Sequence, residues 1–297
     1  MFHPVLQRLL KKLELSADSA PNAKAWARFL ERVDRSYRDN DQDRYIVERS
    51  LEISSDEMRD TTRQLQSALE QVRNLSLTDE LTGLRNRRFL NVSIPDDAAL
   101  VIRKYRTQGS EQRVSTDSDM LFFMVDLDLF KNVNDTYGHL AGDMVLSQTG
   151  KLLVACSRST DFVIRWGGEE FLVVARQACR ADLQFLAERI RTTVEAHRFD
   201  IGKDKPIHLT CSVGAAAFPF MVKWPELLSW DRVVELADLC LYAAKRSGRN
   251  AWVEILPTGL ISLNELVSSL ATHLPELIQK AKLEVFSNLP PDKVLFQ

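Results

Sequence analysis

Membrane spans, secretion signals and a basic excess are all missing from this chain of 297 residues. No apolar run approaches the roughly 18 residues needed to cross a bilayer, and the N-terminus lacks the layout of a signal peptide. The net charge of −2 at pH 7 argues against nucleic acid as the main partner, because non-specific nucleic-acid binders carry a clear excess of Lys and Arg. We therefore expect a cytoplasmic protein with no membrane span and no nucleic-acid partner.

Paired cysteines are missing too. The four cysteines are widely spaced and form no C-x-x-C pair, so free thiols are favoured over disulfides or a zinc site. The sequence also has no internal repeat and no low-complexity tract. What it does have is 45% hydrophobic and 27% charged residues, enough for one substantial core with accessory segments or for two small domains.

Residues 1–45 are predicted to form a helical N-terminal regulatory segment. Their apolar positions indicate two short amphipathic helices on either side of a break from Ser16 to Asn22. These helices have too little apolar surface for an independent core, so we expect the segment to pack on something else. The sequence leaves open whether that is a second copy of the segment, an upstream sensor protein or a ligand.

Residues 46–76 are predicted to form a coiled-coil signalling stalk. Apolar residues recur seven apart at Leu51, Met58, Leu65 and Val72, in a stretch without Pro or Gly. The other seam positions hold mostly small or polar residues, which makes a weak seam that suits a shift of register. We expect the stalk to pair two chains into a homodimer; the alternative is one amphipathic helix that lies on the globular domain.

From residue 77 onwards, apolar runs alternate with helical patterns. Strands are predicted at 121–125, 162–164, 171–174, 207–218 and 251–255, and helices at 142–156, 182–197 and 230–247. Without the final helix and strand, this order is β-α-β-β-α-β, the ferredoxin-like pattern of an antiparallel sheet with helices on one face. We therefore predict an α+β fold over residues 77–255, followed by a helical C-terminal tail over 256–297 that Pro275 interrupts.

A Gly-Gly turn followed by two carboxylates marks the centre of this domain. Gly167 and Gly168 let the backbone approach a bulky ligand, and Glu169 and Glu170 offer hard oxygens that suit Mg²⁺. In the predicted fold the strand that ends at Asp126 neighbours this hairpin, so the three carboxylates would form a cluster of the kind that two-metal nucleotidyl transfer needs. The alternative is a solvated hairpin with two surface glutamates.

Asp128 and Lys131, which follow Asp126 in the sequence, each have two possible interpretations. Asp128 either joins the carboxylate cluster or is a plain surface carboxylate. Lys131 either lies near a phosphate or is a solvated lysine.

Four separated motifs together resemble the GGDEF-family diguanylate cyclases. The segment Gly167-Gly168-Glu169-Glu170-Phe171 is the GGEEF variant, and the opening signature (79–88), the metal and base-recognition segment (126–143) and the closing Lys245-x-x-Gly248-Arg249-Asn250 also match. The resemblance covers residues 77–255 and implies the nucleotidyl-cyclase palm, a βαββαβ core with an extra helix and strand. It also implies that two GTP molecules condense into cyclic di-GMP and two pyrophosphates, by metal-assisted attack of a 3′-hydroxyl on an α-phosphate across a dimer.

The resemblance carries roles to individual residues. It implies two Mg²⁺ or Mn²⁺ ions per active site, held by Asp126, Glu169 and the backbone carbonyl of Leu127, with Glu170 assisting metal binding or deprotonation. The substrate-binding residues that it implies are Asn134 and Asp143 for guanine, Lys245 and Arg249 for the triphosphate, and Gly167, Gly168, Lys131 and His139 as lining residues. His139 has an equally good structural interpretation.

An inhibitory site for the product is implied by a second short motif. Arg158-Ser-Thr-Asp161 begins nine residues before the glycines and matches the family's R-x-x-D site, where guanidinium and carboxylate grip one ligand. Arg189 on the next helix matches a further contact of that site, with an exposed helix arginine as the alternative. Product inhibition of the cyclase through Arg158 and Asp161 is therefore expected.

Three rival functions fit parts of the same sequence. A silent cyclic di-GMP receptor would use only Arg158 and Asp161, a dimeric scaffold would use neither site, and a cyclase could act on ATP. The intact Asp126, Glu169, Glu170, Lys245 and Arg249 favour the GTP-dependent enzyme over the silent forms.

Overall fold

The computed structural model describes residues 3–12, 23–75, 77–107, 118–258 and 274–296. The chain divides into two compact units, Met1–Leu75 and Ser76–Gln297, and each is described by itself. One predicted feature, the break from Ser16 to Asn22, lies outside the described residues.

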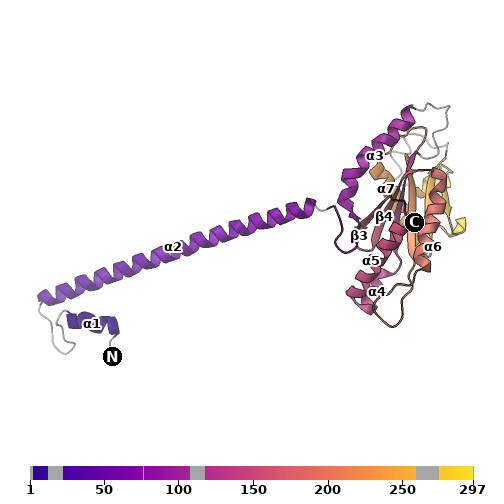
Figure 1. The fold of residues 1–297 in the computed structure, drawn as a ribbon. Coiled ribbons are helices and arrows are strands. Elements are labelled where there is room, and N and C mark those ends of the chain that lie inside the picture. Colours follow the sequence, from indigo (N-terminus) through magenta and orange to yellow (C-terminus); the bar gives the residue numbers. More distant parts are fainter. Residues whose placement is uncertain (1–2, 13–22, 76, 108–117, 259–273, 297) are drawn as a thin grey trace. The chain divides into compact units, whose positions relative to one another are not determined.

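In the described part of the N-terminal unit, the chain forms helices α1, Pro4–Lys12, and α2, Ala23–Leu75 (Figure 1). The prediction of a second short helix is wrong, because α2 runs for 53 residues and no helix boundary separates residues 45 and 46. The absence of Pro and Gly between residues 23 and 75 explains this continuity, since these two residues are the strongest helix breakers. Leu51, Met58, Leu65 and Val72 are all more than 60% exposed in the single chain.

The C-terminal unit contains a seven-stranded sheet in the order β1-β3-β4-β2-β5-β6-β7. The strands are β1 Arg85–Asn86, β2 Asp119–Leu127, β3 Phe162–Gly167, β4 Glu170–Ala178, β5 Cys211–Phe218, β6 Trp252–Pro257 and β7 Leu283–Ser287. The helices are α3 Arg87–Thr107, α4 Phe130–Tyr137, α5 His139–Ala155, α6 Leu183–Ala196, α7 Trp230–Arg246 and α9 Leu274–Gln279, with short 3-10 turns at Arg180–Asp182 and Pro291–Lys293. The chain order from β2 to β5 confirms the predicted β-α-β-β-α-β core.

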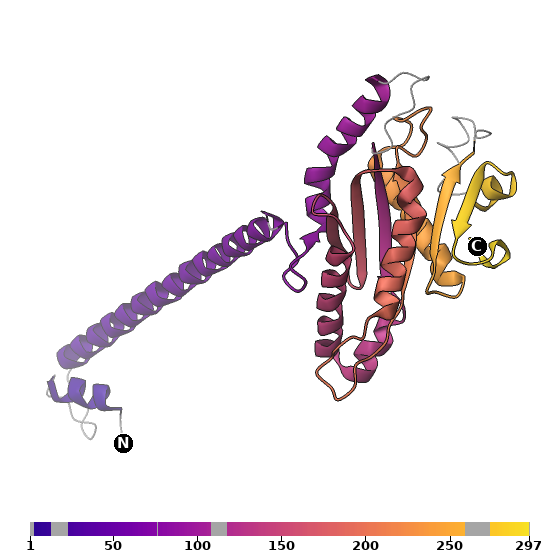
Figure 2. The same cartoon turned by 45° about the vertical axis from the view of Figure 1, so that its right-hand side comes forward.

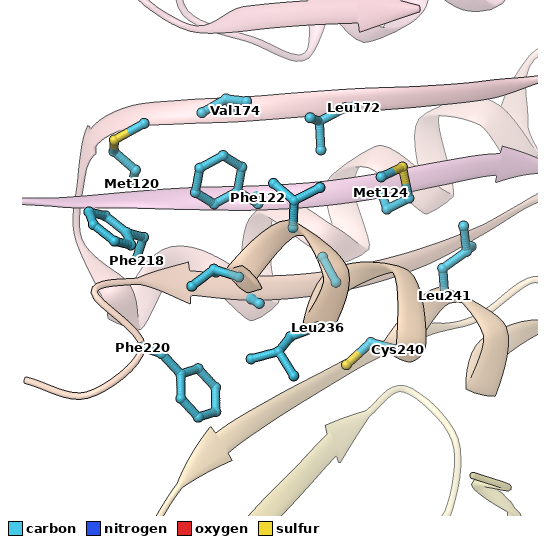
Figure 3. Close-up of a cluster of buried hydrophobic side chains, with 14 of the residues drawn as sticks. Met120, Phe122, Met124, Leu172, Val174, Phe218, Phe220, Leu236, Cys240 and Leu241 are labelled. Atoms are coloured by element: carbon cyan, nitrogen blue, oxygen red, sulfur yellow. The ribbon is translucent and has the colours of Figure 1, made fainter. Parts of the chain in front are cut away.

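Helices cover both faces of the sheet. Helices α5 and α6 of the β-α-β-β-α-β core lie on one face, as predicted, and α3 and α7, which are not part of that core, cover the other face. On central strand β2, Met120, Phe122 and Met124 pack in a cluster with α7 (Figure 3). Buried residues of α3 belong to the same cluster. The intervening Leu121, Phe123 and Val125 belong to a second cluster with α4, α5 and α6. Every residue of β2 is buried, and a strand that is apolar at successive positions needs cover on both sides.

Close packing of α7 on β5 depends on Gly214. A Cβ atom there would lie 2.0 Å from the Ala237 carbonyl oxygen and 2.1 Å from the Leu241 backbone nitrogen. Only glycine lets the helix approach the strand this closely. The approach fixes the course of α7, whose last turn carries Lys245.

The C-terminal tail extends the sheet. Strand β7 pairs antiparallel with β6, and the two strands lie side by side as the orange and yellow arrows of Figure 2. The tail predicted as helical therefore also contains a strand, while its described helix, α9, is only six residues long. Pro275 is the second residue of α9, where the missing N–H has no partner to lose. Residues 259–273 are outside the described part.

Candidate active site

The register of the sheet brings the acidic residues together. Asp126 lies opposite Glu170 in the antiparallel pair of β2 and β4, and Glu170 lies opposite Gly167 in the β3–β4 hairpin. Asp126 is 5% exposed, whereas both glutamates of the turn are half-buried. The predicted neighbourhood of Asp126 and the Gly-Gly turn therefore exists in the fold.

Lys245 supplies a positive charge to this cluster from the last turn of α7. Its Nζ atom lies 2.7 Å from Asp126 Oδ2. The pKa of the Asp126 carboxyl is raised to about 6: burial is the main cause, Lys245 opposes the rise, and the nearby Glu169 and Glu170 add to it. Burial also raises the pKa of Glu170, with Asp238 and Glu169 adding to the effect. The cluster thus holds more negative charge than one lysine balances.

The donor set fits a hard divalent cation that binds together with a phosphate substrate. Within the described ranges, no three Asp, Glu, His or Cys side chains are grouped closely enough to hold an ion by themselves. Mg²⁺ typically needs only one or two carboxylates and takes its other ligands from water and substrate phosphates. Asp126, Glu169 and the carbonyl of Leu127 offer such a partial set, and an added cation would relieve the repulsion that raises the Asp126 pKa.

A half-buried ion pair between Arg165 and Asp79 holds the Gly-Gly turn, and it was not predicted from the sequence. The Arg165 guanidinium donates to the Gly168 carbonyl through Nε and Nη2 at 3.1 and 2.9 Å, and its Nη1 lies 3.1 Å from both Asp79 oxygens. Asp79 in turn accepts hydrogen bonds from the backbone N–H and the hydroxyl of Thr82. Gly168, with φ +52°, and Gly167 are exposed. Arg165 and Asp79 therefore fix the conformation of the turn, while its two glycines remain accessible to a ligand.

The two predicted guanine-binding residues lie on neighbouring helices, and a glycine brings them together. A Cβ atom at Gly142 would lie 2.0 Å from Asn134 Oδ1, so the Asn134 side chain rests against the α5 backbone beside Asp143. Asn134 and Asp143 are both half-buried. Lys131 and His139 are exposed on the same two helices.

Asp128 is not the plain surface carboxylate of one interpretation. It is 5% exposed, so the surface interpretation is wrong. Its oxygens accept hydrogen bonds from the hydroxyls of Thr210 and Ser212, both at 2.7 Å, and from the backbone N–H of Asn250 at 2.9 Å. Its carboxylate ties the end of β2 to the turn that follows α7.

That turn carries Arg249 in a left-handed conformation. Gly248, Arg249 and Asn250 have φ values of +113°, +65° and +47°. Asn250 is held from three sides, because besides Asp128 its side chain bonds Arg191 Nη1 at 2.8 Å and Glu195 Oε1 at 2.6 Å. Helix α6 thus anchors the turn while the Arg249 side chain remains exposed.

The loop predicted to bind product forms a compact structure before β3. Asp161 accepts a hydrogen bond from the Arg158 backbone N–H at 2.8 Å and another from the Arg176 backbone N–H at 3.2 Å. Arg189 donates to the Cys156 carbonyl, so it lies beside this loop and is not the exposed arginine of the alternative interpretation. Its guanidinium also lies 5.7 Å from the ring centre of Phe185, which is 66% exposed.

Comparison with known proteins identifies the family. The model of the family described as "Diguanylate cyclase, GGDEF domain" matches residues 76–251. With its seven-stranded α+β sheet and its carboxylate turn, the C-terminal unit has the nucleotidyl-cyclase palm fold. The chain belongs to the GGDEF family of diguanylate cyclases.

Individual relatives agree with this assignment. Diguanylate cyclase A of Treponema denticola is 31% identical over 220 residues, which are 74% of this chain and 53% of that protein. Diguanylate cyclase DgcP of Pseudomonas aeruginosa is 34% identical over 244 residues, 81% of this chain and 33% of the relative. The chain thus spans between a third and about half of the length of these curated relatives.

A solved structure is similar as well. The coiled coil and GGDEF domain of DgcB from Caulobacter crescentus, in complex with c-di-GMP, is 27% identical, with a TM-score of 0.50 and coverage of 68% of this chain and 97% of that one.

None of the helices in the described ranges is both long and apolar enough to cross a membrane.

Proposed function

We propose that this protein condenses two GTP molecules into cyclic di-GMP and two pyrophosphates. In each of two steps, a 3′-oxygen forms a bond to an α-phosphorus, the bond to the bridging α–β oxygen breaks, and pyrophosphate leaves. One observation carries the proposal: Asp126, Glu170 and the exposed Gly-Gly turn meet where β2 ends and β4 begins, with Lys245 Nζ 2.7 Å from Asp126 Oδ2. We call this group of residues the carboxylate edge. This edge combines a hard-cation site with a cation for phosphate.

The metal ions are proposed to be two Mg²⁺ or Mn²⁺ per active site, held by Asp126, Glu169 and the Leu127 carbonyl. Such ions lower the pKa of an attacking hydroxyl and neutralise the charge of the triphosphate and leaving group. Glu170, whose pKa burial raises, is suited to accept the hydroxyl proton. Lys245 and the exposed Arg249 provide a point charge and a planar fork for the triphosphate.

Guanine is the proposed base because of the pair Asn134 and Asp143. A carboxylate can accept hydrogen bonds from guanine N1 and N2, a donor pair that adenine lacks. The contact of Asn134 with the Gly142 backbone supports this role, since it holds the amide beside Asp143 before any substrate binds.

A homodimer is proposed as the working state. One C-terminal unit carries one carboxylate edge, whereas the reaction needs two bound GTP molecules that face each other. The apolar residues of α2 that recur every seven positions are exposed in the single chain, as expected of a seam that pairs with a second copy. Product inhibition through Arg158, Asp161 and Arg189 is proposed as the control that acts on the C-terminal unit.

The test is incubation of the purified full chain with GTP and Mg²⁺, followed by chromatography of the products, over a range of protein concentrations. Cyclic di-GMP with two equivalents of pyrophosphate is expected, at a specific activity that rises with protein concentration. ATP in place of GTP should release no pyrophosphate. Binding of cyclic di-GMP without turnover of GTP would instead identify a silent receptor, and neither binding nor turnover would identify a scaffold.

A further inference from the structure

A cavity of about 320 Å³ lies outside the carboxylate site, between the second half of α3 and the ends of β2 and β4. Val101 and Met120, 5% and 1% exposed, belong to its lining, together with the more exposed Leu100. Its volume is within the range of small-molecule sites in proteins. The cavity therefore offers an apolar surface of the size that a small aromatic or aliphatic body fills.

The charged residues around this cavity are mostly basic. Arg176 forms an ion pair with Asp97, with 2.6 Å between Nη2 and Oδ1, so these two charges balance each other. Arg103 and Lys104, on the last turns of α3, also line the cavity, and neither has an ion-pair partner among the residues that the structure describes. An anion placed here would meet two available cations.

Two further features of the lining have an energetic cost. Asp97 Oδ2 and Arg176 Nε are buried without a hydrogen-bond partner in the described structure. Gln177, the next residue of β4, has a φ of +47°, a left-handed conformation that residues other than glycine rarely adopt. Unpaired buried polar atoms and strained backbone are uncommon and tend to gather at functional sites. Here both occur at adjacent residues of one cavity.

We propose that this cavity, lined by Val101, Met120, Arg103, Lys104 and Arg176, binds a small organic anion that consists of an aromatic or aliphatic body and one phosphate or carboxylate group. The body occupies the apolar surface, and the anionic group binds Arg103 and Lys104 through charge-assisted hydrogen bonds. Neither half of such a ligand would bind well alone, because charge and apolar surface are both needed.

Occupancy of the cavity acts on the neighbouring loop 158–161 through Arg176. The Arg176 backbone N–H donates to Asp161 Oδ1 at 3.2 Å, its Nη1 donates to the Thr160 carbonyl at 3.1 Å, and its guanidinium lies 4.5 Å from the ring centre of Phe162. A ligand that changes the position of Arg176 therefore changes the loop that holds Arg158. This second half of the inference rests on the proposed product site; the binding of the anion does not.

Binding can be located by the methyl resonance of Met120. The full chain contains six methionines, so labelling their methyl groups with ¹³C gives a short spectrum in which Met120→Leu identifies the Met120 signal. Phenyl phosphate is the probe, and inorganic phosphate and benzyl alcohol represent its charge and its body alone. We expect phenyl phosphate to shift the Met120 resonance with saturation, and each half-probe to bind at least about tenfold more weakly.

Variants then test the assignment of the cations. The double variant Arg103→Ala/Lys104→Ala should weaken the affinity for phenyl phosphate about tenfold or more, while Lys151→Ala, an exposed helical lysine on α5, should leave it unchanged. No saturable shift of the Met120 resonance in the wild type, or the same affinity in the double variant, would overturn the proposed site.

The coupling to the loop is measured separately, by calorimetric titration of cyclic di-GMP with and without saturating phenyl phosphate. A change of at least about threefold in the product dissociation constant is expected, and an unchanged constant would overturn the coupling. Arg158→Ala should weaken product binding roughly ten- to a hundredfold and keep the Met120 shift. If the wild type bound phenyl phosphate but neither bound cyclic di-GMP nor consumed GTP, the proposed function would fail while the anion site stood.

Discussion

Helix α2 and strand β2 place their side chains in opposite environments. In α2 every described side chain from residue 34 to 68 is exposed, including the apolar residues that recur every seven positions. In β2 all nine residues are buried, and the seven apolar ones belong to two clusters on opposite faces of the sheet. Local ion pairs between residues three or four apart, such as Arg49 with Glu52, support α2, and each such pair contributes only about 0.3–0.5 kcal/mol.

This difference shows where each unit obtains its stability. The sheet is complete within one chain, because α3, α7 and the α4–α6 layer bury both of its faces. None of the side chains of α2 that the structure describes is buried, and helical stability in water comes chiefly from packing of an apolar face. The C-terminal unit is therefore expected to fold alone, whereas α2 needs a partner surface that a second copy can supply.

The largest effect is expected when the carboxylate edge is disabled while both units stay folded. Asp126→Asn keeps the size of the side chain and removes the charge that a metal ion and Lys245 both use. We expect turnover of GTP to fall at least about 10²-fold, since one oriented metal contact supplies several kcal/mol of transition-state stabilisation. Glu170→Gln should have an effect of the same order.

The measurement is steady-state pyrophosphate release, accompanied by a thermal unfolding curve. Asp96→Asn, an exposed aspartate on α3, is the matched control and should retain wild-type turnover. Near wild-type turnover in Asp126→Asn would show that the reaction does not use this edge.

The carboxylate edge was predictable because its residues come from short, continuous motifs. Once β2 and the hairpin were assigned, the side-chain register of neighbouring strands followed, and so did the meeting of Asp126 with Glu170. The loop of Arg158 and Asp161 was predictable because these two residues are three apart in one short motif.

The supports of the site were not predictable, because they join residues that are distant in sequence. Arg165 reaches Asp79 across 86 positions, and Asn250 reaches Asp128 across 122. An isolated arginine or aspartate has no periodic signal that would name its partner. Strand β7 was not predicted for a related reason. Its apolar stretch is short and could equally end a helix, and it becomes a strand because it pairs with the free edge of β6.

The buried carboxyl group of β6, Glu254, should make the stability of the C-terminal unit depend on pH. Glu254 is 1% exposed, one of its oxygens has no hydrogen-bond partner in the described structure, and burial raises its pKa to about 7. Its carboxyl is protonated in the folded state below that pH, whereas the unfolded chain releases the proton near pH 4–5. Stability from this group is therefore fully present below about pH 4 and is lost as the pH rises through about 7.

Urea unfolding of the wild type and of Glu254→Gln at pH 5 and pH 8 measures this loss. Between these pH values, we expect the free energy of unfolding of the wild type to fall by roughly 2–3 kcal/mol relative to the variant, as an upper value for a shift of this size. A constant difference between the two proteins would show that Glu254 remains ionised throughout. Glu284→Gln on β7, outside the buried core, serves as the control.

Product control should be separable from turnover. Arg158→Ala removes one side chain of the inhibitory loop, which is distinct from the carboxylate edge, so the initial velocity should stay nearly unchanged. Loss of a charged contact should weaken product binding by about 1.5–3 kcal/mol, roughly ten- to a hundredfold. Progress curves of the variant should therefore remain linear for longer; if they level off at the wild-type product concentration, the loop is not the inhibitory site.

The role of α2 is tested by dilution. Leu65→Asp/Val72→Asp would place like charges across a paired seam and should separate the protomers. We expect specific activity to fall about tenfold at low protein concentration and to recover in part at high concentration, because a second encounter then depends on mass action. Arg63→Asp/Gln64→Asp changes charge beside the seam and is the control. Full activity of the seam variant at every dilution would mean that another part of the chain pairs the protomers.

The smallest effect is expected from the anchor of the turn that carries Arg249. Asn250→Ala would remove the bonds to Arg191 and Glu195 while its backbone N–H could still reach Asp128. It would also put alanine at φ +47°, where asparagine is far better tolerated. Arg249 would then be less well held for the triphosphate, so KM for GTP should rise roughly fivefold with a smaller change in kcat.

A merely structural role would show a different pattern. Loss of stability alone would reduce kcat and the melting temperature together and leave KM unchanged. Asn250→Gly, which tolerates the left-handed backbone but makes neither side-chain bond, separates the two contributions: KM should stay raised even though the strain is relieved. Asn91→Ala, an exposed asparagine on α3, should match the wild type. If Asn250→Gly had a wild-type KM, backbone conformation alone would hold the turn, and α6 would have no part in binding the triphosphate.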